Sequence, residues 1–220
     1  MFQRNLKIIL QAVLLLGVAL EIYEDQWLHA LLVFGIFFLT VLPSLLAREL
    51  EVFIPSELAW LALAFVFASL FLGEIRDYYG RFWWWDLLLH MTSGGLLGLF
   101  GFMLVFVLNA NPRVHLQMRP GFVAAFAFCF SVTIGTLWEI FEFAMDGFVG
   151  STMQKPMFGD PSGLTDTMWD LIVDAVGALL VSVFGYRSIR DERRSVVRSW
   201  IRRFIDANPK LFPRAGQTPD

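Results

Sequence analysis

Residues 83–108 read WWWDLLLHMTSGGLLGLFGFMLVFVL, and this stretch decides the class of the fold. It is long enough to cross the roughly 30 Å hydrocarbon core of a membrane as one helix, which takes about 20 apolar residues. Its leading tryptophans are typical of the membrane interface. Asp86 and His90 nevertheless lie near its beginning. Because an ionisable side chain inside hydrocarbon is energetically expensive, these two residues predict a functional site within a membrane helix.

Further apolar runs of similar length indicate an integral membrane protein. Of the 220 residues, 57% are hydrophobic, including 23 Phe and 8 Trp, which is unusual for a soluble domain. The runs are continuous, which favours helices over the alternating strands of a porin-like barrel. We expect an all-α bundle of six transmembrane helices, at residues 6–22, 27–46, 56–73, 83–108, 121–148 and 165–186. They would form one domain, residues 1–186, followed by a tail, residues 187–220.

The basic residues predict how the helices cross the membrane. With the N-terminus in the cytoplasm, 14 of the 17 Lys and Arg residues fall on the cytoplasmic side, and Arg76, Arg81 and Lys155 fall outside. This distribution follows the positive-inside rule, so we expect both termini in the cytoplasm. An alternative interpretation makes residues 1–19 a cleaved signal peptide, because basic residues there precede a short apolar run that ends in small residues.

The tail predicts a helix on the cytoplasmic membrane surface. Residues 187–203 carry seven arginines, while apolar residues recur at helical spacing at Val196, Val197, Trp200, Ile201 and Phe204. A basic face opposite an apolar stripe is typical of a helix lying in the membrane interface, where anionic lipids attract it. Docking to a partner protein is the alternative. Topology already explains the arginines, so they do not indicate nucleic-acid binding.

Ionisable side chains cluster on the last three predicted helices. The clusters are Asp86 with His90; Glu139, Glu142 and Asp146; and Asp166, Asp170 and Asp174. Within each cluster, a spacing of three or four residues places the side chains on one helix face. At about 1.5 Å per residue, His90, Glu139 and Asp174 would all lie about 10–14 Å below the outer surface. The clusters therefore predict one polar pocket that opens to the outside.

Many carboxylates in one pocket need a counter-charge. Crowded like charges either take up protons or bind cations. Carboxylates with one imidazole suit a divalent metal ion such as Mg²⁺, Mn²⁺ or Ca²⁺, with Zn²⁺ or Fe²⁺ less favoured. We expect the metal ligands to be His90, Glu139, Glu142, Asp170 and Asp174. Asp86 and Asp166 would act as catalytic base or hold a ligand in place.

These residues leave three functions open. The leading hypothesis is a metal-dependent hydrolase or phospho- or group transferase that acts on a lipid or cell-envelope substrate at the outer leaflet. The second is a transporter or channel for protons or divalent cations, although the inner halves of the later helices offer no charge to line a path. The third is a non-catalytic assembly or sensor protein. Carboxylates at helix mouths, such as Asp86, Asp146 and Asp166, also have an ordinary explanation in solvation, and the helix dipole favours Asp86 and Asp166 near the starts of their helices.

Two neighbouring features bear on the pocket. The small residues Ser93, Gly94, Gly95 and Gly98 predict that another helix approaches closely. The connection at residues 147–164 would lie over the pocket, either as a lid or as an ordinary solvated loop.

Four short segments between residues 72 and 178 carry a family resemblance. They are Leu72-Gly73-Glu74, Trp84-Trp85-Asp86 with His90 and Ser93-Gly94, Trp138-Glu139-Ile140-Phe141-Glu142, and Thr165-Asp166-Thr167 leading to Asp170, Asp174 and Gly177-Ala178. On these segments the chain resembles the YjdF-like family of uncharacterised bacterial inner-membrane proteins. The resemblance implies an architecture and a location in the bacterial inner membrane, but no reaction. The order of the acidic clusters is more loosely similar to VanZ-like membrane proteins, linked with resistance to glycopeptide antibiotics, and this implies cell-envelope chemistry.

Overall fold

The computed structural model describes residues 2–25, 56–110 and 118–190, with shorter stretches at 27, 30, 33–35, 37–38, 41, 199, 203–204 and 206–208. These residues are helical apart from turns, loops and an isolated bridge between Met157 and Asp160. The predicted all-α class is therefore confirmed for the part of the chain that is described. The chain divides into two compact units, Met1–Phe82 and Trp83–Asp220, and each is considered by itself.

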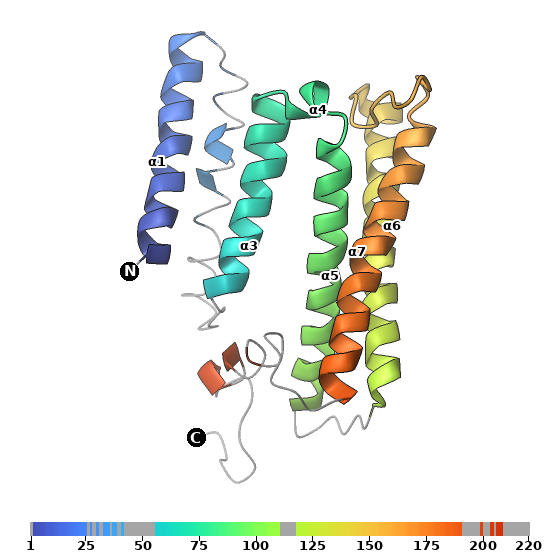
Figure 1. Ribbon diagram of the computed structural model, residues 1–220. Helices are drawn as coiled ribbons and strands as arrows, with labels where there is room; N and C mark the ends of the chain where they lie inside the picture. Colours follow the sequence, from blue (N-terminus) through green and yellow to red (C-terminus); the bar gives the residue numbers. More distant parts are fainter. Residues whose placement is uncertain are drawn as a thin grey trace. The chain divides into compact units, whose positions relative to one another are not determined.

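The longer elements described in the first unit are α1, α3 and two shorter helices (Figure 1). The elements are α1 (Phe2–Tyr23), α3 (Ser56–Val66), the π-helix η1 (Phe67–Ile75) that continues α3, and α4 (Tyr78–Arg81). Leu14 and Val33 are fully buried in its core. Helices thus occupy the first and third predicted spans, but their apolar parts, Gln11–Tyr23 and Trp60–Ile75, are shorter than the about 20 residues that a membrane crossing takes.

The second unit contains the three long helices that Figure 1 shows side by side, α5 (Trp85–Ala110), α6 (Pro120–Val149) and α7 (Leu164–Arg190). Each is long and apolar enough to cross a membrane, which confirms three of the six predicted spans by length and composition. Pro120 suits the first turn of α6 because its fixed φ is already helical. Gly150 ends that helix with a φ of 73°, a left-handed conformation that glycine adopts without strain.

Glycine residues allow the three helices to pack closely. A Cβ atom at Gly94 on α5 would collide with the backbone of Asp174 on α7, and one at Gly177 would collide with the carbonyl oxygen of Met91. Between α5 and α6, a Cβ atom at Gly101 would lie 2.8 Å from the Cα atom of Ala127. The close approach that the small residues of α5 predict is therefore confirmed, and it brings backbones together as in other membrane bundles.

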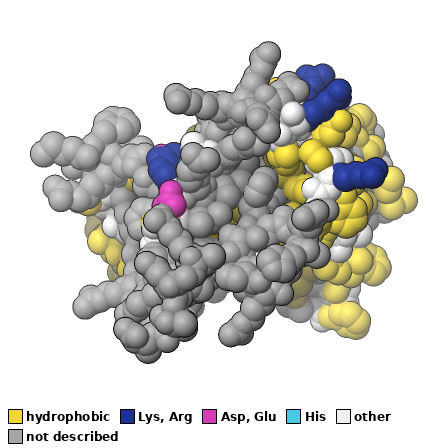
Figure 2. All heavy atoms as spheres, turned by 90° about the horizontal axis from the view of Figure 1, so that it is seen from below, with side chains coloured by type: hydrophobic (Ala, Val, Ile, Leu, Met, Phe, Trp, Pro, Cys, Tyr) yellow, Lys and Arg dark blue, Asp and Glu magenta, His cyan; other side chains and the backbone are white. Residues whose placement is uncertain are grey.

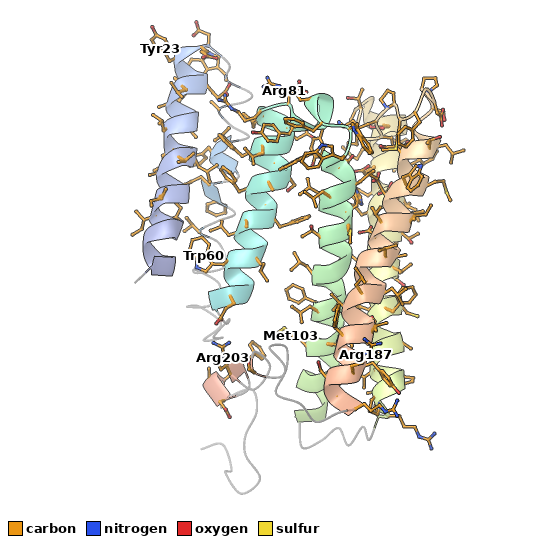
Figure 3. The ribbon with its side chains drawn as sticks, in the orientation of Figure 1. Tyr23, Trp60, Arg81, Met103, Arg187 and Arg203 are labelled. Carbon is orange, nitrogen blue, oxygen red and sulfur yellow. The ribbon has the colours of Figure 1, made fainter. Side chains whose placement is uncertain are left out.

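The two ends of this helix bundle differ in character. The end where α5 and α7 begin carries the connection at residues 150–163 (Figure 1). At the opposite end, Arg119 precedes α6, and Arg187 and Arg190 lie in the last turn of α7. Figure 2, seen from that end, shows Lys and Arg side chains among hydrophobic ones, and Figure 3 labels Met103 and Arg187 in the same half.

Two predicted elements lie mostly outside the described residues. These are the second transmembrane helix, at residues 27–46, and the basic amphipathic tail, at residues 187–220. The six-helix arrangement, the cytoplasmic tail helix and the division into residues 1–186 and 187–220 therefore stay predictions.

Candidate functional site

His90 lies at the centre of a group of carboxylates from α5, α6 and α7. Its Nε2 atom is 3.6 Å from Oδ1 of Asp86, on the same helix. Its Nδ1 atom is 3.4 Å from Oδ2 of Asp174 on α7 and 3.6 Å from Oε1 of Glu139 on α6. The three clusters that the sequence separates by tens of residues thus meet in one carboxylate/His group, within the second unit.

The group is almost completely buried. Its buried members are at most 8% exposed, and they are His90, Glu139, Glu142, Asp166, Asp170 and Asp174. Within the described residues, Glu139, Glu142, Asp170 and Asp174 form no ion pair with a lysine or arginine. Several buried carboxylates that face one imidazole need protons or a bound cation to offset their charge.

Asp170 is a fully buried carboxylate without a hydrogen-bond partner in the described part of the chain. Its side chain is 0% exposed, and neither carboxylate oxygen accepts a hydrogen bond from the described part of the chain. Buried carboxylates ordinarily accept hydrogen bonds, pair with a charge or coordinate a metal ion. A ligand atom each from Asp86, His90 and Asp170 lies within 4.8 Å of the others. Atoms that bind one ion at about 2.0–2.6 Å are separated by no more than about 5 Å, so these three residues could hold a metal.

Other carboxylates of the group do have hydrogen-bond partners. Oε1 of Glu142 accepts a hydrogen bond from Nε1 of Trp138 at 2.9 Å, one helical turn away on α6. Oδ1 of Asp174 accepts one from Oγ of Ser93 at 2.8 Å, across the contact between α5 and α7. The group therefore contains carboxylates that are held by hydrogen bonds and two, Glu139 and Asp170, whose oxygens accept none within the described residues. Of these two, Glu139 lies beside the Nδ1 atom of His90.

Glycine also makes room for the side chain of Asp174. A Cβ atom at Gly135, on α6, would collide with the Asp174 carboxylate. Gly135 lies four residues before Glu139 and so shares its helix face. Without these two close contacts, at Gly94 and Gly135, α7 could not approach near enough to place Asp174 beside His90.

The connection between α6 and α7 begins with a turn built on Asp146. Its Oδ1 atom accepts hydrogen bonds from Oγ of Ser151 at 2.6 Å and from the backbone nitrogen of Met153 at 2.7 Å. Its Oδ2 atom accepts one from the backbone nitrogen of Gln154 at 2.9 Å. Asp146, which the sequence places in the same cluster as Glu139, thus organises the loop.

Asp166 joins this loop to the buried group. Its Oδ2 atom accepts a hydrogen bond from the backbone nitrogen of Lys155 at 2.6 Å, while its Oδ1 atom accepts none from the described residues. Next to it, Nε2 of Gln154 donates to Oγ1 of Thr167 at 2.7 Å. The loop is therefore bonded to the first turn of α7 directly above Asp170.

Asp160 anchors the other end of the loop to the start of α7. Its Oδ2 atom accepts hydrogen bonds from the backbone nitrogen and the hydroxyl of Thr165, at 3.0 and 2.7 Å, and its Oδ1 atom accepts one from the backbone nitrogen of Ser162 at 2.9 Å. These hydrogen bonds from Ser162 and Thr165 favour the charged carboxylate and hold the pKa of Asp160 below its usual range.

A tight hairpin presents an aromatic side chain at the tip of the loop. The backbones of Met157 and Asp160 exchange two hydrogen bonds, of 3.1 and 2.9 Å. Between them, Phe158 and Gly159 have φ values of 50° and 86°, as in a type I′ turn. A left-handed conformation costs a bulky residue about 1–2 kcal/mol. The Phe158 ring is nevertheless exposed, with its centroid 6.0 Å from that of Trp83 and 6.3 Å from that of Trp169.

The structure thus brings together the seven residues to which the sequence assigns a site role, while leaving the roles themselves as predictions. Asp86, Glu139 and Asp174 each lie beside the imidazole of His90, and Asp170 joins Asp86 and His90. Glu142 and Asp166 lie at the edges, bonded to Trp138 and to the loop; Glu142 is a proposed ligand and Asp166 a proposed base.

The sequence does not reveal the supporting roles of two residues, Gly135 and Trp138, although Trp138 lies in a segment that carries the family resemblance. Gly135 precedes Glu139 by one helical turn, and Trp138 precedes Glu142 by one turn, so their spacing contains a signal of a shared helix face. The spacing can be interpreted only once α7 is known to pack against this face of α6.

Comparison with known proteins agrees with the membrane character of the helices. The model of a family described as "Predicted membrane protein (DUF2238)" matches residues 4–191. An "Uncharacterized protein" of Thermotoga maritima is 30% identical over 134 residues, which are 61% of this chain and 64% of that protein. No solved structure matches the chain. Because the family match spans most of its length, including every residue of the carboxylate/His group, the chain belongs to the DUF2238 family of predicted membrane proteins.

Proposed function

We propose that this membrane protein binds a divalent metal ion in its carboxylate/His group and uses it to act on a lipid or cell-envelope substrate. The observation that carries the proposal is Asp170, which is fully buried and whose oxygens accept no hydrogen bond within the described residues. An ion held together with Asp86 and His90 would give those oxygens a partner and offset part of the negative charge.

The donor set suits a hard or borderline ion. Carboxylates with one imidazole are ligands for Mg²⁺, Mn²⁺, Ca²⁺ or Zn²⁺. Glu139, Glu142 and Asp174 surround the three nearest donors and remain proposed ligands or partners of the same ion. Such an ion supplies Lewis-acid activation of water or of a phosphoryl oxygen.

Asp166 is the residue best arranged to act as the base. Its Oδ2 atom is fixed by the backbone nitrogen of Lys155, and its Oδ1 atom accepts no hydrogen bond from the described residues. A general base needs a carboxylate that is oriented and that has an oxygen available for a proton. Asp86, for which the sequence also suggests a catalytic role, lies close enough to His90 and Asp170 to be a metal ligand.

Exposed aromatic side chains support a lipid-linked substrate. Trp83, Phe158 and Trp169 lie next to one another at the end of the bundle where the group is buried, and all three are exposed. Aromatic rings at the ends of membrane-spanning helices prefer the headgroup region. A substrate with an apolar chain and a polar head would place its head near the carboxylates while its chain stays in the bilayer.

The proposal includes the membrane arrangement that the basic residues predict. Six spans, with both termini in the cytoplasm of the bacterial inner membrane, would direct the carboxylate/His group outward. Arg119, Arg187 and Arg190 lie at the opposite end of α6 and α7, as this orientation requires. The tail would bind anionic lipids, and the family resemblance to YjdF-like proteins agrees with this location.

Transport of protons or cations is less well supported. A conduction path needs polar groups through the whole depth of the membrane. Along the rest of α5, α6 and α7, the buried polar side chains that the structure describes are Ser131 and Ser182.

The test is the metal content of the full-length protein purified in detergent and loaded with Mn²⁺ or Zn²⁺. We expect about one equivalent of metal in the parent, loss of metal in Asp170→Asn, and retention in Asp77→Asn, whose carboxylate is exposed and paired with Arg81. Absence of metal from the loaded parent would overturn the metal proposal and favour proton-coupled transport or a role in assembly.

The substrate class requires a second measurement. Phosphate-ester lipids in mixed micelles, incubated with loaded parent, Asp166→Asn and Asp77→Asn, should be turned over by the parent and the Asp77 variant but not by the Asp166 variant. Equal turnover by all three would remove Asp166 from the mechanism, whereas metal binding without turnover of any lipid would favour a structural ion.

A further inference from the structure

The two ring nitrogens of His90 face different carboxylates. Nε2 is 3.6 Å from Asp86, which shares the candidate metal group with Asp170. Nδ1 points the other way, 3.4 Å from Asp174 and 3.6 Å from Glu139. Because the nitrogens lie on separate edges of the imidazole, the geometry gives them separate tasks.

Asp174 is fixed much more firmly than Asp170. Its Oδ1 atom accepts a hydrogen bond from the Ser93 hydroxyl at 2.8 Å, and the same hydroxyl lies 2.8 Å from the backbone oxygen of His90. Gly94 and Gly135 press against the backbone and the carboxylate of Asp174, so neighbouring helices enclose it. A carboxylate in this position can rotate or shift little.

We infer that Asp174 is a positioning residue, which accepts the Nδ1–H of His90 and so turns Nε2 toward the metal ion, and is not itself a ligand. This inference rests on the proposed function and deepens it. Histidine ligands commonly donate their other ring N–H to a carboxylate, which sets the tautomer and the orientation of the ring. Ser93 completes the arrangement by holding the far oxygen of Asp174.

The contrast with Asp170 supports this division of roles. Asp174 uses one oxygen for Ser93 and the other for His90, whereas both oxygens of Asp170 are buried without a hydrogen-bond partner in the described chain. A metal ligand needs oxygens that are available to the ion, and a positioning residue needs oxygens that are already engaged. The sequence cannot make this distinction, because the two residues occupy successive turns of the same helix.

Cobalt provides a direct test, because the visible spectrum of bound Co²⁺ reports its ligands and geometry. The full-length protein would be titrated with Co²⁺ in detergent, beside Asp174→Asn, Asp174→Ala, Ser93→Ala and Asp170→Asn. We expect Asp174→Ala to weaken Co²⁺ binding about 10–100-fold with an unchanged spectrum at saturation, and Asp174→Asn to weaken it less, since the amide oxygen still accepts the Nδ1–H. Ser93→Ala should act in the same direction and more weakly.

Asp170→Asn distinguishes a ligand from a positioning residue. We expect it to lose Co²⁺ or to change the spectrum. If Asp174→Asn changes the spectrum in the same way, Asp174 is a ligand and the inference is wrong, although the metal site stands. If the parent binds no Co²⁺, the proposed function fails and the inference fails with it. Equal affinity of the parent, Asp174→Ala and Ser93→Ala would also overturn the positioning role.

Discussion

The two halves of the α5–α6–α7 bundle are built from the same helices but filled with opposite chemistry. One half buries His90 and several carboxylates, whereas the other contains the apolar cluster of Phe102, Val105, Val123 and Ala127. Both halves depend on glycine contacts: Gly94 meets Asp174 in the first, and Gly185 meets the Phe102 ring in the second. Close packing therefore does not determine polarity, and the same tight helix contact can enclose either a site or an apolar core.

The two halves also contribute differently to the free energy of folding. The apolar half gains from dispersion and close fit, which need no partner outside the chain. The polar half buries carboxylates that cost free energy until protons or a cation offset them. We therefore expect the apolar half to hold the helices together and the polar half to carry the function.

The largest effect should come from Phe102→Ala. Phe102 is 1% exposed, and emptying its position leaves a cavity that costs about 3–5 kcal/mol of unfolding free energy. Unfolding of the detergent-purified protein would measure the loss, and metal uptake by the folded fraction should stay at the parent value. A selective loss of metal from folded Phe102→Ala protein would show that the two halves are not separable.

Gly94→Ala should give the next largest effect, because its Cβ atom would collide with the backbone of Asp174. Forcing α5 and α7 apart costs about 1–3 kcal/mol and should also weaken metal binding. Gly121→Ala is the matched control, since nothing lies within 4 Å of a Cβ atom at that helical position. Equal unfolding midpoints for the two variants would contradict the close contact at Gly94.

Phe158→Asn tests whether the backbone strain in the hairpin over the polar half is retained because the exposed Phe158 ring is needed for function. Asparagine tolerates a φ of 50° better than phenylalanine, so the variant should be more stable by about 1 kcal/mol. Phe148→Asn, which removes a 92% exposed ring from a helix, controls for the loss of an exposed phenylalanine. We expect Phe158→Asn to gain stability and to lose turnover of lipid substrates, and Phe148→Asn to do neither. A lower stability of Phe158→Asn would contradict the presence of backbone strain at Phe158.

The smallest effect concerns pH and the loop. The folded pKa of Asp160 is depressed by hydrogen bonds from Ser162 and Thr165, so its contribution to stability is present above the unfolded pKa and is lost as pH falls through the folded value. Amide hydrogen exchange in residues 150–163 should be faster in Asp160→Asn than in the parent at neutral pH. The difference should shrink as pH falls below about 3.9, the ordinary pKa of an aspartate. A difference that does not depend on pH would contradict this linkage.

Much of the architecture could be predicted because its signals are local. Continuous apolar runs gave the three long helices at nearly their observed bounds, and spacings of three or four residues gave the shared faces of Asp86 with His90 and of Asp170 with Asp174. The loop was harder to predict. Its composition allows a lid or an ordinary connection, whereas its bonds to Asp146, Asp160 and Asp166 depend on turn geometry that composition does not encode.

The sequence by itself determined the membrane class, the long helices and the residues that make the carboxylate/His group, because hydrophobic length and helical period act between near neighbours in the chain. Only the tertiary structure decided which carboxylates have partners. His90 and Asp174 are 84 residues apart, and the hydrogen bond that separates the role of Asp174 from that of Asp170 exists only when glycine lets α5 and α7 touch. The reason is that a local pattern fixes the direction of a side chain on its own helix, while its partner depends on how closely distant helices pack.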